Sequence, residues 1–260
     1  MWELIEGNGP LVATAIHDGH NVRKEIAGLY RIDEASRLRE EDPYSGRWTD
    51  IAETRIIGTV SRFEMDLNRP REKAVYIKPD DAWGLHVWEN DPADDLVEQS
   101  LRQYDAFYVM AREVLSKIEK RHGKFIVLDL HTYNHRREGP DAPPADPDEN
   151  PEINVGTGSM DRDLWEPVIN RFISDLSNVD FDGRKLDVRE NIKFRGGQFS
   201  NWVHQQFPTS GCALAIEVKK FFMDEWSGTL HRDLFGFIHK ALGSTVPGLL
   251  EELEKLGARV

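Results

Sequence analysis

The sequence contains one cysteine among its 260 residues, Cys212, which excludes a disulfide bond within the chain. Such sparse use of cysteine is typical of a reducing compartment, and we expect a cytoplasmic protein. Cys212 lies in the apolar run SGCALAIEVKKFF, where a buried structural cysteine is more common than a nucleophile. Amide hydrolysis by a cysteine nucleophile is therefore a secondary hypothesis.

Long apolar runs and an excess of basic residues are also missing. No apolar stretch approaches the ~20 residues that a membrane-spanning helix needs. The first residues, MWELIEGNGP, lack the basic and apolar regions of a signal peptide. A formal net charge of -13 argues against binding to nucleic acid or to an anionic membrane. An anionic substrate would therefore require arginines concentrated at the site, against the field of the whole protein.

The rest of the composition is that of a folded α/β protein. Hydrophobic residues make up 39% of the chain and charged residues 30%, which argues against disorder. The length allows one large domain with a substantial core. Because no shift in composition marks a linker, we predict one domain, residues 1–260.

Apolar runs alternate with helical patterns along the chain. Strands are predicted at 11–16, 63–67, 124–131 and 212–222, and the clearest helix spans 92–123. Further helical patterns are found in 22–48, 161–176, 228–241 and 246–257. Alternation of this kind favours a parallel sheet with helices on its faces. The segment 138–158, rich in Pro, Asp and Gly, is predicted to be a long surface loop, either a lid or simply mobile.

Histidines and an acid lie where predicted strands end. His17 and His20 follow the first strand, His131 ends the run KFIVLDLH, and Glu217 lies in the last strand. The carboxyl ends of parallel strands form the crevice in which α/β proteins bind ligands. Three such ligands with an open position suit a catalytic zinc ion, and Glu217 could act as general base on its bound water. Taken singly, each residue also fits a polar turn, a core histidine or an ion pair.

Arginines are concentrated near two further turns. Arg62, Asn68 and Arg69 lie in VSRFEMDLNRPR, and Arg195 lies beside two glycines in KFRGGQF. Arginine can hold a carboxylate with two hydrogen bonds, asparagine adds a neutral donor, and glycine allows close approach to the backbone. The more common role of any single arginine is a surface ion pair.

The order of these motifs resembles that of the N-formylglutamate amidohydrolase family. H-x-x-H, DLNRPR, LDLH, FRGGQ and IEV follow one another between about residues 10 and 225. More distantly, the sequence resembles zinc carboxypeptidases and the aspartoacylase and succinylglutamate desuccinylase group. The resemblance implies one catalytic domain with a three-layer αβα fold of the zinc carboxypeptidase-like (phosphorylase/hydrolase-like) type. Its central sheet would be mixed and mostly parallel.

The resemblance also implies a metal site. His17 and His131 match the two ligand histidines, and His20 stands where carboxypeptidases have a glutamate. We expect His17, His20 and His131 to bind one zinc ion, with Asp18 or Asp50 as alternatives to His20. Sites of this kind also accept Mn, Fe, Co or Ni.

Roles for the other site residues follow from the same resemblance. Glu217 falls on the general base, and Asn68 with Arg69 falls on the pair that grips the substrate carboxylate. Arg195 would assist that pair, and we take Arg62 as the donor to the oxyanion.

The implied activity is hydrolysis of N-formyl-L-glutamate to formate and L-glutamate, as in histidine breakdown. The implied partner is a small anionic N-acyl amino acid, with no nucleic acid and no membrane. One alternative is a deacylase or carboxypeptidase-like metallopeptidase that acts on another N-acyl amino acid or on a peptide. A second alternative, from a different class, is a non-catalytic ligand-binding protein that keeps the fold.

Overall fold

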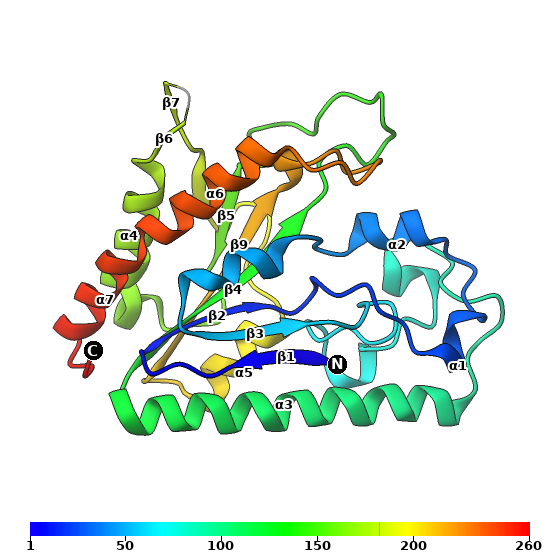
Figure 1. Cartoon of the computed structure of the whole chain (residues 1–260), viewed down its shortest axis with the longest axis horizontal. Coiled ribbons are helices and arrows are strands. Elements are labelled where there is room, and N and C mark those ends of the chain that lie inside the picture. Colours follow the sequence, from blue (N-terminus) through cyan, green and yellow to red (C-terminus); the bar gives the residue numbers. More distant parts are fainter. Residues whose placement is uncertain (182) are drawn as a thin grey trace.

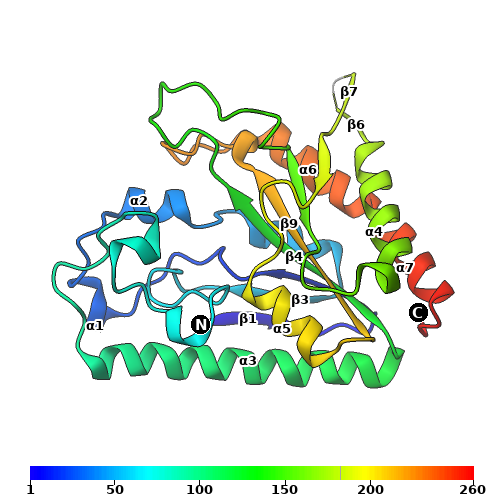
Figure 2. The same cartoon turned by 180° about the vertical axis from the view of Figure 1, so that it is seen from behind.

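The computed structural model describes residues 1–181 and 183–260, and within them seven strands form one mixed sheet (Figures 1 and 2). Its order is β1 (Trp2–Ile5), β3 (Thr54–Gly58), β2 (Leu11–Ala15), β4 (Phe125–Tyr133), β9 (Gly211–Lys219), β5 (Ile153–Gly156) and β8 (Val188–Glu190). β1 pairs antiparallel with β3, and β5 pairs antiparallel with β9, whereas the other neighbours are parallel. The predicted mixed, mostly parallel sheet is confirmed.

Helices cover both faces of the sheet. α3 (Asp94–His122) and α5 (Gln198–Gln206) pack on one face, and their apolar residues form one core cluster with β2 and β4. α4 (Arg162–Ser177), α6 (Arg232–Ser244), α7 (Val246–Lys255) and the 3₁₀ helix Ser45–Ile51 cover the other face. Two views from opposite sides agree on these three layers (Figures 1 and 2). The predicted three-layer α/β arrangement is therefore confirmed.

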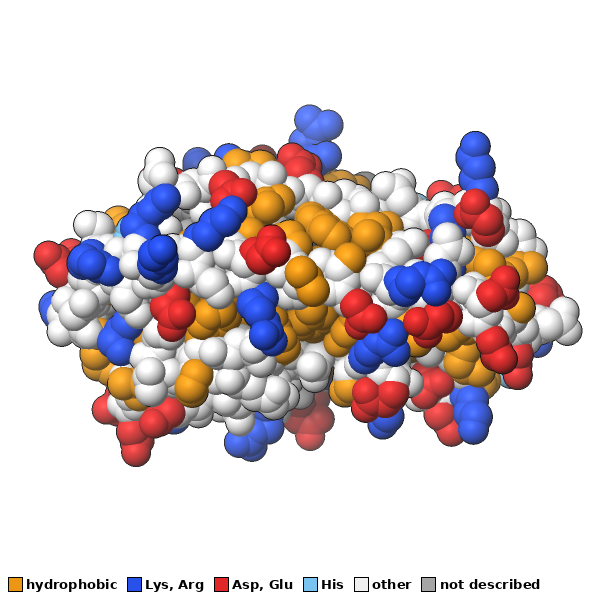
Figure 3. Space-filling model, turned by 90° about the horizontal axis from the view of Figure 1, so that it is seen from below, with side chains coloured by type: hydrophobic (Ala, Val, Ile, Leu, Met, Phe, Trp, Pro, Cys, Tyr) orange, Lys and Arg blue, Asp and Glu red, His pale blue; other side chains and the backbone are white. Residues whose placement is uncertain are grey.

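The long helix α3 ends where the sequence predicts. Residues at helical spacing, including Phe107, Ala111, Leu115 and Ile118, are buried against the sheet. Gly123 ends the helix with a φ of 81°, a left-handed conformation that favours glycine. On the opposite side of α3, acidic and basic side chains are interspersed with apolar patches (Figure 3).

Shorter elements complete the fold. α1 (Lys24–Ala27) and α2 (Glu34–Glu40) follow β2, and β6 (Asp180–Phe181) pairs with β7 (Arg184–Lys185) as a small ribbon. Further single turns of 3₁₀ helix lie at Arg71–Lys73, Pro79–Ala82 and Lys220–Phe222. Among the described helices, none combines the length and the apolar character needed to cross a bilayer.

One predicted element is wrong, and another extends too far. Residues 63–67 form a turn rather than a strand, because Glu64 and Met65 both donate backbone hydrogen bonds to the carbonyl of Ser61. The neighbouring strand is β3, which the sequence analysis missed. The loop predicted over 138–158 ends earlier, because residues 153–156 form β5 between β8 and β9.

The three central strands place their carboxyl ends at one edge of the sheet. β2, β4 and β9 run parallel, and in their register His131 lies opposite Glu217. Side chains of paired residues on neighbouring strands project from the same face of a sheet. The fold therefore brings two of the predicted site residues together without any contribution from a loop.

Candidate metal and substrate site

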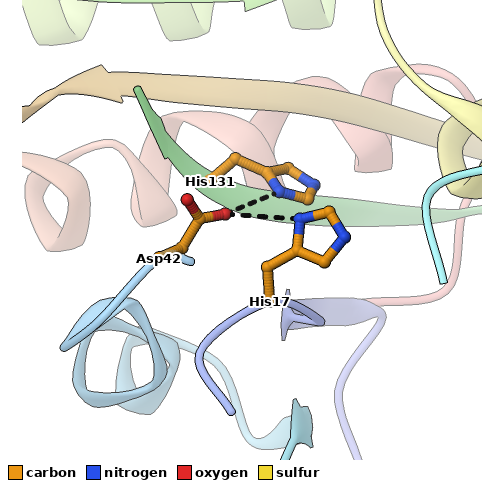
Figure 4. Close-up of side chains that lie close together, drawn as sticks. All are labelled: His17, Asp42 and His131. Carbon is orange, nitrogen blue, oxygen red and sulfur yellow. Dashed lines mark hydrogen bonds and ion pairs between the residues drawn. The ribbon is translucent and has the colours of Figure 1, made fainter. Parts of the chain in front are cut away.

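Three buried side chains converge at this edge of the sheet. His17 lies two residues beyond β2, His131 lies near the end of β4, and Asp42 lies between α2 and the 3₁₀ helix Ser45–Ile51. Asp42 Oδ2 is 3.5 Å from His17 Nδ1 and 3.1 Å from His131 Nδ1 (Figure 4). One ligand atom from each residue lies within 4.8 Å of the others, and each residue is at most 2% exposed. Two imidazoles and a carboxylate form a donor set suited to zinc or a related divalent ion.

The far side of each imidazole ring faces a second carboxylate. His17 Nε2 is 2.7 Å from Asp66 Oδ1, and His131 Nε2 is 3.0 Å from Asp129 Oδ2. A proton on each Nε2 would leave the Nδ1 lone pair directed toward Asp42. Metal-binding histidines commonly have such a carboxylate partner, which fixes the ring and its tautomer. His17 Nδ1 has no hydrogen-bond partner among the described residues, so this buried nitrogen is available as a ligand atom.

Asp42 is held ionised and in place by its neighbours. Burial raises the pKa of this carboxyl group, but interactions with His131 and His17 outweigh burial and bring the pKa below its usual range. Thr132 Oγ1 donates a hydrogen bond to Asp42 Oδ1 at 2.8 Å. The buried Lys220 donates through Nζ to the carbonyl of Glu41 at 2.8 Å and so holds the backbone just before Asp42. A buried carboxylate anion of this kind requires a positive partner.

Glu217 is a candidate for a base. Its half-buried side chain lines the same cavity as the three converging residues. Burial raises the pKa of Glu217 to about 7, although the positive charges of His131 and His17 oppose that shift. A carboxyl group with a pKa near neutrality can both accept and return a proton at physiological pH. Glu217 therefore has the position and the acidity of a general base.

A cavity of about 360 Å³ extends over these side chains. Every site residue predicted from the sequence except His20 lines it: His17, Arg62, Asn68, Arg69, His131, Arg195 and Glu217. Arg137, Lys193 and Lys220 add further positive charge, and Glu40 and Asp42 add negative charge. Six basic residues and three acidic residues therefore line this cavity in a protein whose net charge is -13. The local excess of positive charge favours an anionic substrate.

Asn68 is oriented by the start of α5. The backbone N–H of Phe199 donates to Asn68 Oδ1 at 3.0 Å, so the amide oxygen already has a partner. The Nδ2 group then remains as a donor for a ligand. Asn68 also packs tightly on Gly197, where any added Cβ atom would lie 2.2 Å from Asn68 Oδ1. Gly197, the second glycine of FRGGQF, thus makes room for the Asn68 side chain.

The arginines differ in their surroundings. Arg62 Nη2 lies 2.7 Å from Asp66 Oδ2, and its Nη1 donates to the carbonyl of Glu40 at 3.1 Å. The guanidinium of Arg62 also lies 4.9 Å from the ring centroid of Trp83. Arg69 is more exposed, with its Nε 4.0 Å from Asp66 Oδ2. Arg62 is therefore a fixed positive charge, whereas Arg69 is freer to bind a ligand.

His20 does not join the converging group. Its Nδ1 lies 2.5 Å from Glu41 Oε2 and its Nε2 lies 3.4 Å from Glu34 Oε1, and the side chain is 32% exposed. The alternatives considered for this position lie elsewhere, because Asp18 accepts a hydrogen bond from Gly46 and the exposed Asp50 pairs with His239. The acidic side chain that converges with His17 and His131 is Asp42, which the sequence analysis missed.

Cys212 lies away from the converging residues and from Glu217. Its side chain is fully buried in β9, one residue from the start of the strand and at the opposite end from Glu217. Burial raises the pKa of the thiol, so the reactive thiolate is disfavoured. Cys212 does not line either of the two cavities near the converging residues. A cysteine-based mechanism has no support from its position.

Comparison with known proteins adds an independent finding. A family model described as N-formylglutamate amidohydrolase matches residues 9–223. The solved structure of N-formylglutamate amidohydrolase from Ralstonia eutropha JMP134 is 16% identical, with a TM-score of 0.70 over 98% of this chain and 97% of that one. The structure of gene product Atu2144 from Agrobacterium tumefaciens is 15% identical, with a TM-score of 0.68 over 96% of each chain. The search of curated proteins gave no match. At these identities the two structures show a shared fold.

Proposed function

Because the chain belongs to the N-formylglutamate amidohydrolase family, we propose that it hydrolyses N-formyl-L-glutamate to formate and L-glutamate in a metal-dependent reaction. The observation that carries this proposal is the convergence of His17, Asp42 and His131 next to Glu217. The arginine-rich lining of the same cavity supports a substrate that carries carboxylates.

We propose His17 Nδ1, His131 Nδ1 and one oxygen of Asp42 as the metal ligands, with Asp42 in place of His20. Two imidazole nitrogens and a carboxylate oxygen are a common ligand set of catalytic zinc. When bound, a zinc ion polarises a carbonyl oxygen and lowers the pKa of a coordinated water to about 7. Asp66 and Asp129 would hold the two imidazole rings in the ligand tautomer.

We assign proton transfer, stabilisation of the oxyanion and substrate binding to residues of the chain. The carboxylate of Glu217 accepts a proton from the attacking water and later delivers it to the leaving amine nitrogen. Arg62 holds a positive charge beside the reacting carbonyl and stabilises the oxyanion. Asn68 Nδ2, Arg69 and Arg195 bind the glutamate carboxylates and fix the direction of the substrate.

The proposed setting is histidine breakdown in the cytoplasm. The single cysteine supports a reducing compartment. The products, formate and glutamate, need no further cofactor for their release.

Formate release from N-formyl-L-glutamate tests this function directly. The purified protein should release formate and glutamate in equal amounts. Removal of metal with a chelator should lower the rate by about 100-fold or more, and added Zn²⁺ should restore it. Full activity in metal-free protein would reject metal dependence. Hydrolysis of other N-acyl amino acids but not of N-formyl-L-glutamate would reject the substrate and leave the mechanism in place.

A substitution outside the ligand set tests the imidazole orientation. Asp129→Asn should weaken Zn²⁺ binding by about 10–100-fold, because an amide cannot supply the charged acceptor that faces His131 Nε2. Titration with a metal-sensitive dye measures the affinity, and excess Zn²⁺ should recover activity. Thr14→Val is the matched control, since it removes only the 2.7 Å hydrogen bond to the other oxygen, Asp129 Oδ1. Equal affinities in wild type and Asp129→Asn would contradict the proposed role of Asp129.

A further inference from the structure

A second cavity, of about 310 Å³, adjoins the first. Glu40, Trp83, Asn134 and Arg137 line both cavities, which therefore meet at these four residues. Asn68, Arg69 and Arg195 line the first cavity and do not line the second. The second cavity thus leads away from the residues proposed to bind the substrate carboxylates.

Asn134 lies at the junction with a polar atom that lacks a partner. This residue follows directly after β4, three positions beyond His131, and its side chain is 4% exposed. Its Oδ1 has no hydrogen-bond partner among the described residues. A buried amide left in this way is costly, and a ligand that supplies a hydrogen bond removes the cost. Asn134 therefore points to a polar group bound between the two cavities.

The charges around the second cavity limit what it can hold. Glu40 pairs with both arginines of the lining, because its carboxylate oxygens lie 3.5 Å from Arg39 Nε and 3.1 Å from Arg137 Nη2. The guanidinium of Arg39 also stacks 4.1 Å from the centroid of Trp226. Glu225 accepts hydrogen bonds from the backbone N–H groups of His135 and Arg136. Together with Glu138 and Glu40 it makes acidic residues outnumber basic ones in this lining. The balance disfavours a carboxylate and favours an uncharged polar group or an ammonium.

We propose that the second cavity is an acyl subsite that accepts an acyl group longer than formyl, with an aminoacyl group as the best match. This inference rests on the proposed function. We place the amide carbonyl at the proposed metal ligands and the carboxylates at Asn68, Arg69 and Arg195. In this placement the acyl substituent extends toward the junction of the two cavities, which Asn134 and Trp83 line. A formyl group has only a hydrogen atom in that direction.

The reaction is the same for every acyl group. Water adds to the amide carbon, the bond from carbon to nitrogen breaks, and the acyl carbon keeps the oxygen of the water as a carboxylic acid. The proton taken up by Glu217 goes to the leaving nitrogen, which departs as the amine of glutamate. The substrate class assigned by the second cavity is therefore an N-aminoacyl amino acid in addition to the N-formyl compound.

Four substrates that differ only in the acyl group test the subsite. The kcat/KM values are measured for N-formyl-, N-acetyl-, N-glycyl- and N-succinyl-L-glutamate with the metal-loaded enzyme. We expect N-glycyl-L-glutamate to exceed N-succinyl-L-glutamate by about tenfold or more, because the cavity disfavours a carboxylate. Leu85, which lines the second cavity and not the first, offers a specific variant. Leu85→Trp should lower the ratio of N-glycyl to N-formyl hydrolysis by about tenfold or more.

Leu85→Ala is the matched control and should leave that ratio close to the wild-type value. If Leu85→Trp does not fold, Asn134→Leu tests the same ratio through the junction between the cavities. An unchanged ratio in the folded variant, or a preference for N-succinyl over N-glycyl, overturns the subsite. Hydrolysis of N-formyl-L-glutamate alone also overturns the subsite and leaves the proposed function standing. No hydrolysis of any of the four compounds rejects the proposed function, and the subsite with it.

Discussion

Glu217→Gln is expected to lower kcat by about 10²–10⁴-fold while the protein still folds and binds its metal. Glutamine keeps the shape of the side chain but cannot accept a proton from water. The substitution also removes the carboxyl group whose pKa burial raises to about 7, so we expect no loss of stability. Steady-state rates of formate release, together with metal content after dialysis, measure the effect. A variant that binds metal and hydrolyses at the wild-type rate would remove Glu217 from the mechanism.

The same carboxyl group predicts the pH dependence. Glu217 must be ionised to act as a base, so kcat/KM should fall as the pH drops through its pKa of about 7. A divalent cation bound nearby stabilises the carboxylate, which places the midpoint at or below pH 7 in the loaded enzyme. The residual activity of Glu217→Gln should lack this acidic limb. A limb that persists unchanged in the variant would belong to another group.

Asp42→Ala is expected to remove the metal and with it the activity. The carboxylate of Asp42 is the point on which both Nδ1 atoms converge, and its loss leaves two imidazoles as the proposed ligands. The loss of Zn²⁺ affinity should exceed the 10–100-fold typical of a residue outside the ligand set. Metal content after dialysis and the rate at saturating Zn²⁺ both measure it.

His20→Ala is the matched comparison for Asp42→Ala. Its imidazole interacts with Glu34 and Glu41 rather than with the converging group, so metal content should stay at the wild-type level. The opposite result, with metal lost in His20→Ala and kept in Asp42→Ala, would favour the ligand set expected from the H-x-x-H motif. The two variants therefore distinguish His20, the ligand expected from the H-x-x-H motif, from Asp42, the ligand proposed from the structure.

The sequence predicted the location of the candidate site residues where they lie on strands, because the pairing of strands determines the positions of their side chains. His131 and Glu217 were predicted at strand ends, and they lie opposite each other because β4 and β9 pair in parallel. Asp42 could not be found in the same way, because it lies between two short helical segments. The run Glu40, Glu41 and Asp42 has the pattern of a solvated acidic surface, yet all three side chains are buried. Their burial depends on contacts with residues distant in the sequence, which the local sequence pattern cannot predict.

The strand predicted over residues 63–67 is wrong because the local sequence pattern and the packing disagree there. Apolar residues alternate at Phe63, Met65 and Leu67, which is typical of a strand. In the structure Phe63 enters one core cluster while Met65 and Leu67 enter another, and the backbone between them turns. Alternation records only that side chains point to opposite sides, and a turn between two cores satisfies it as well as a strand does.

The position of the second cavity affects how the range of accepted acyl groups could be altered by substitution. His131 and Glu217 lie on paired central strands, whereas residues 83–85 and 134–138 lie on connecting segments outside them. Connecting segments tolerate substitution better than the paired strands of a core. A library of variants confined to these segments would therefore test acceptance of other acyl groups while the proposed catalytic residues stay unchanged.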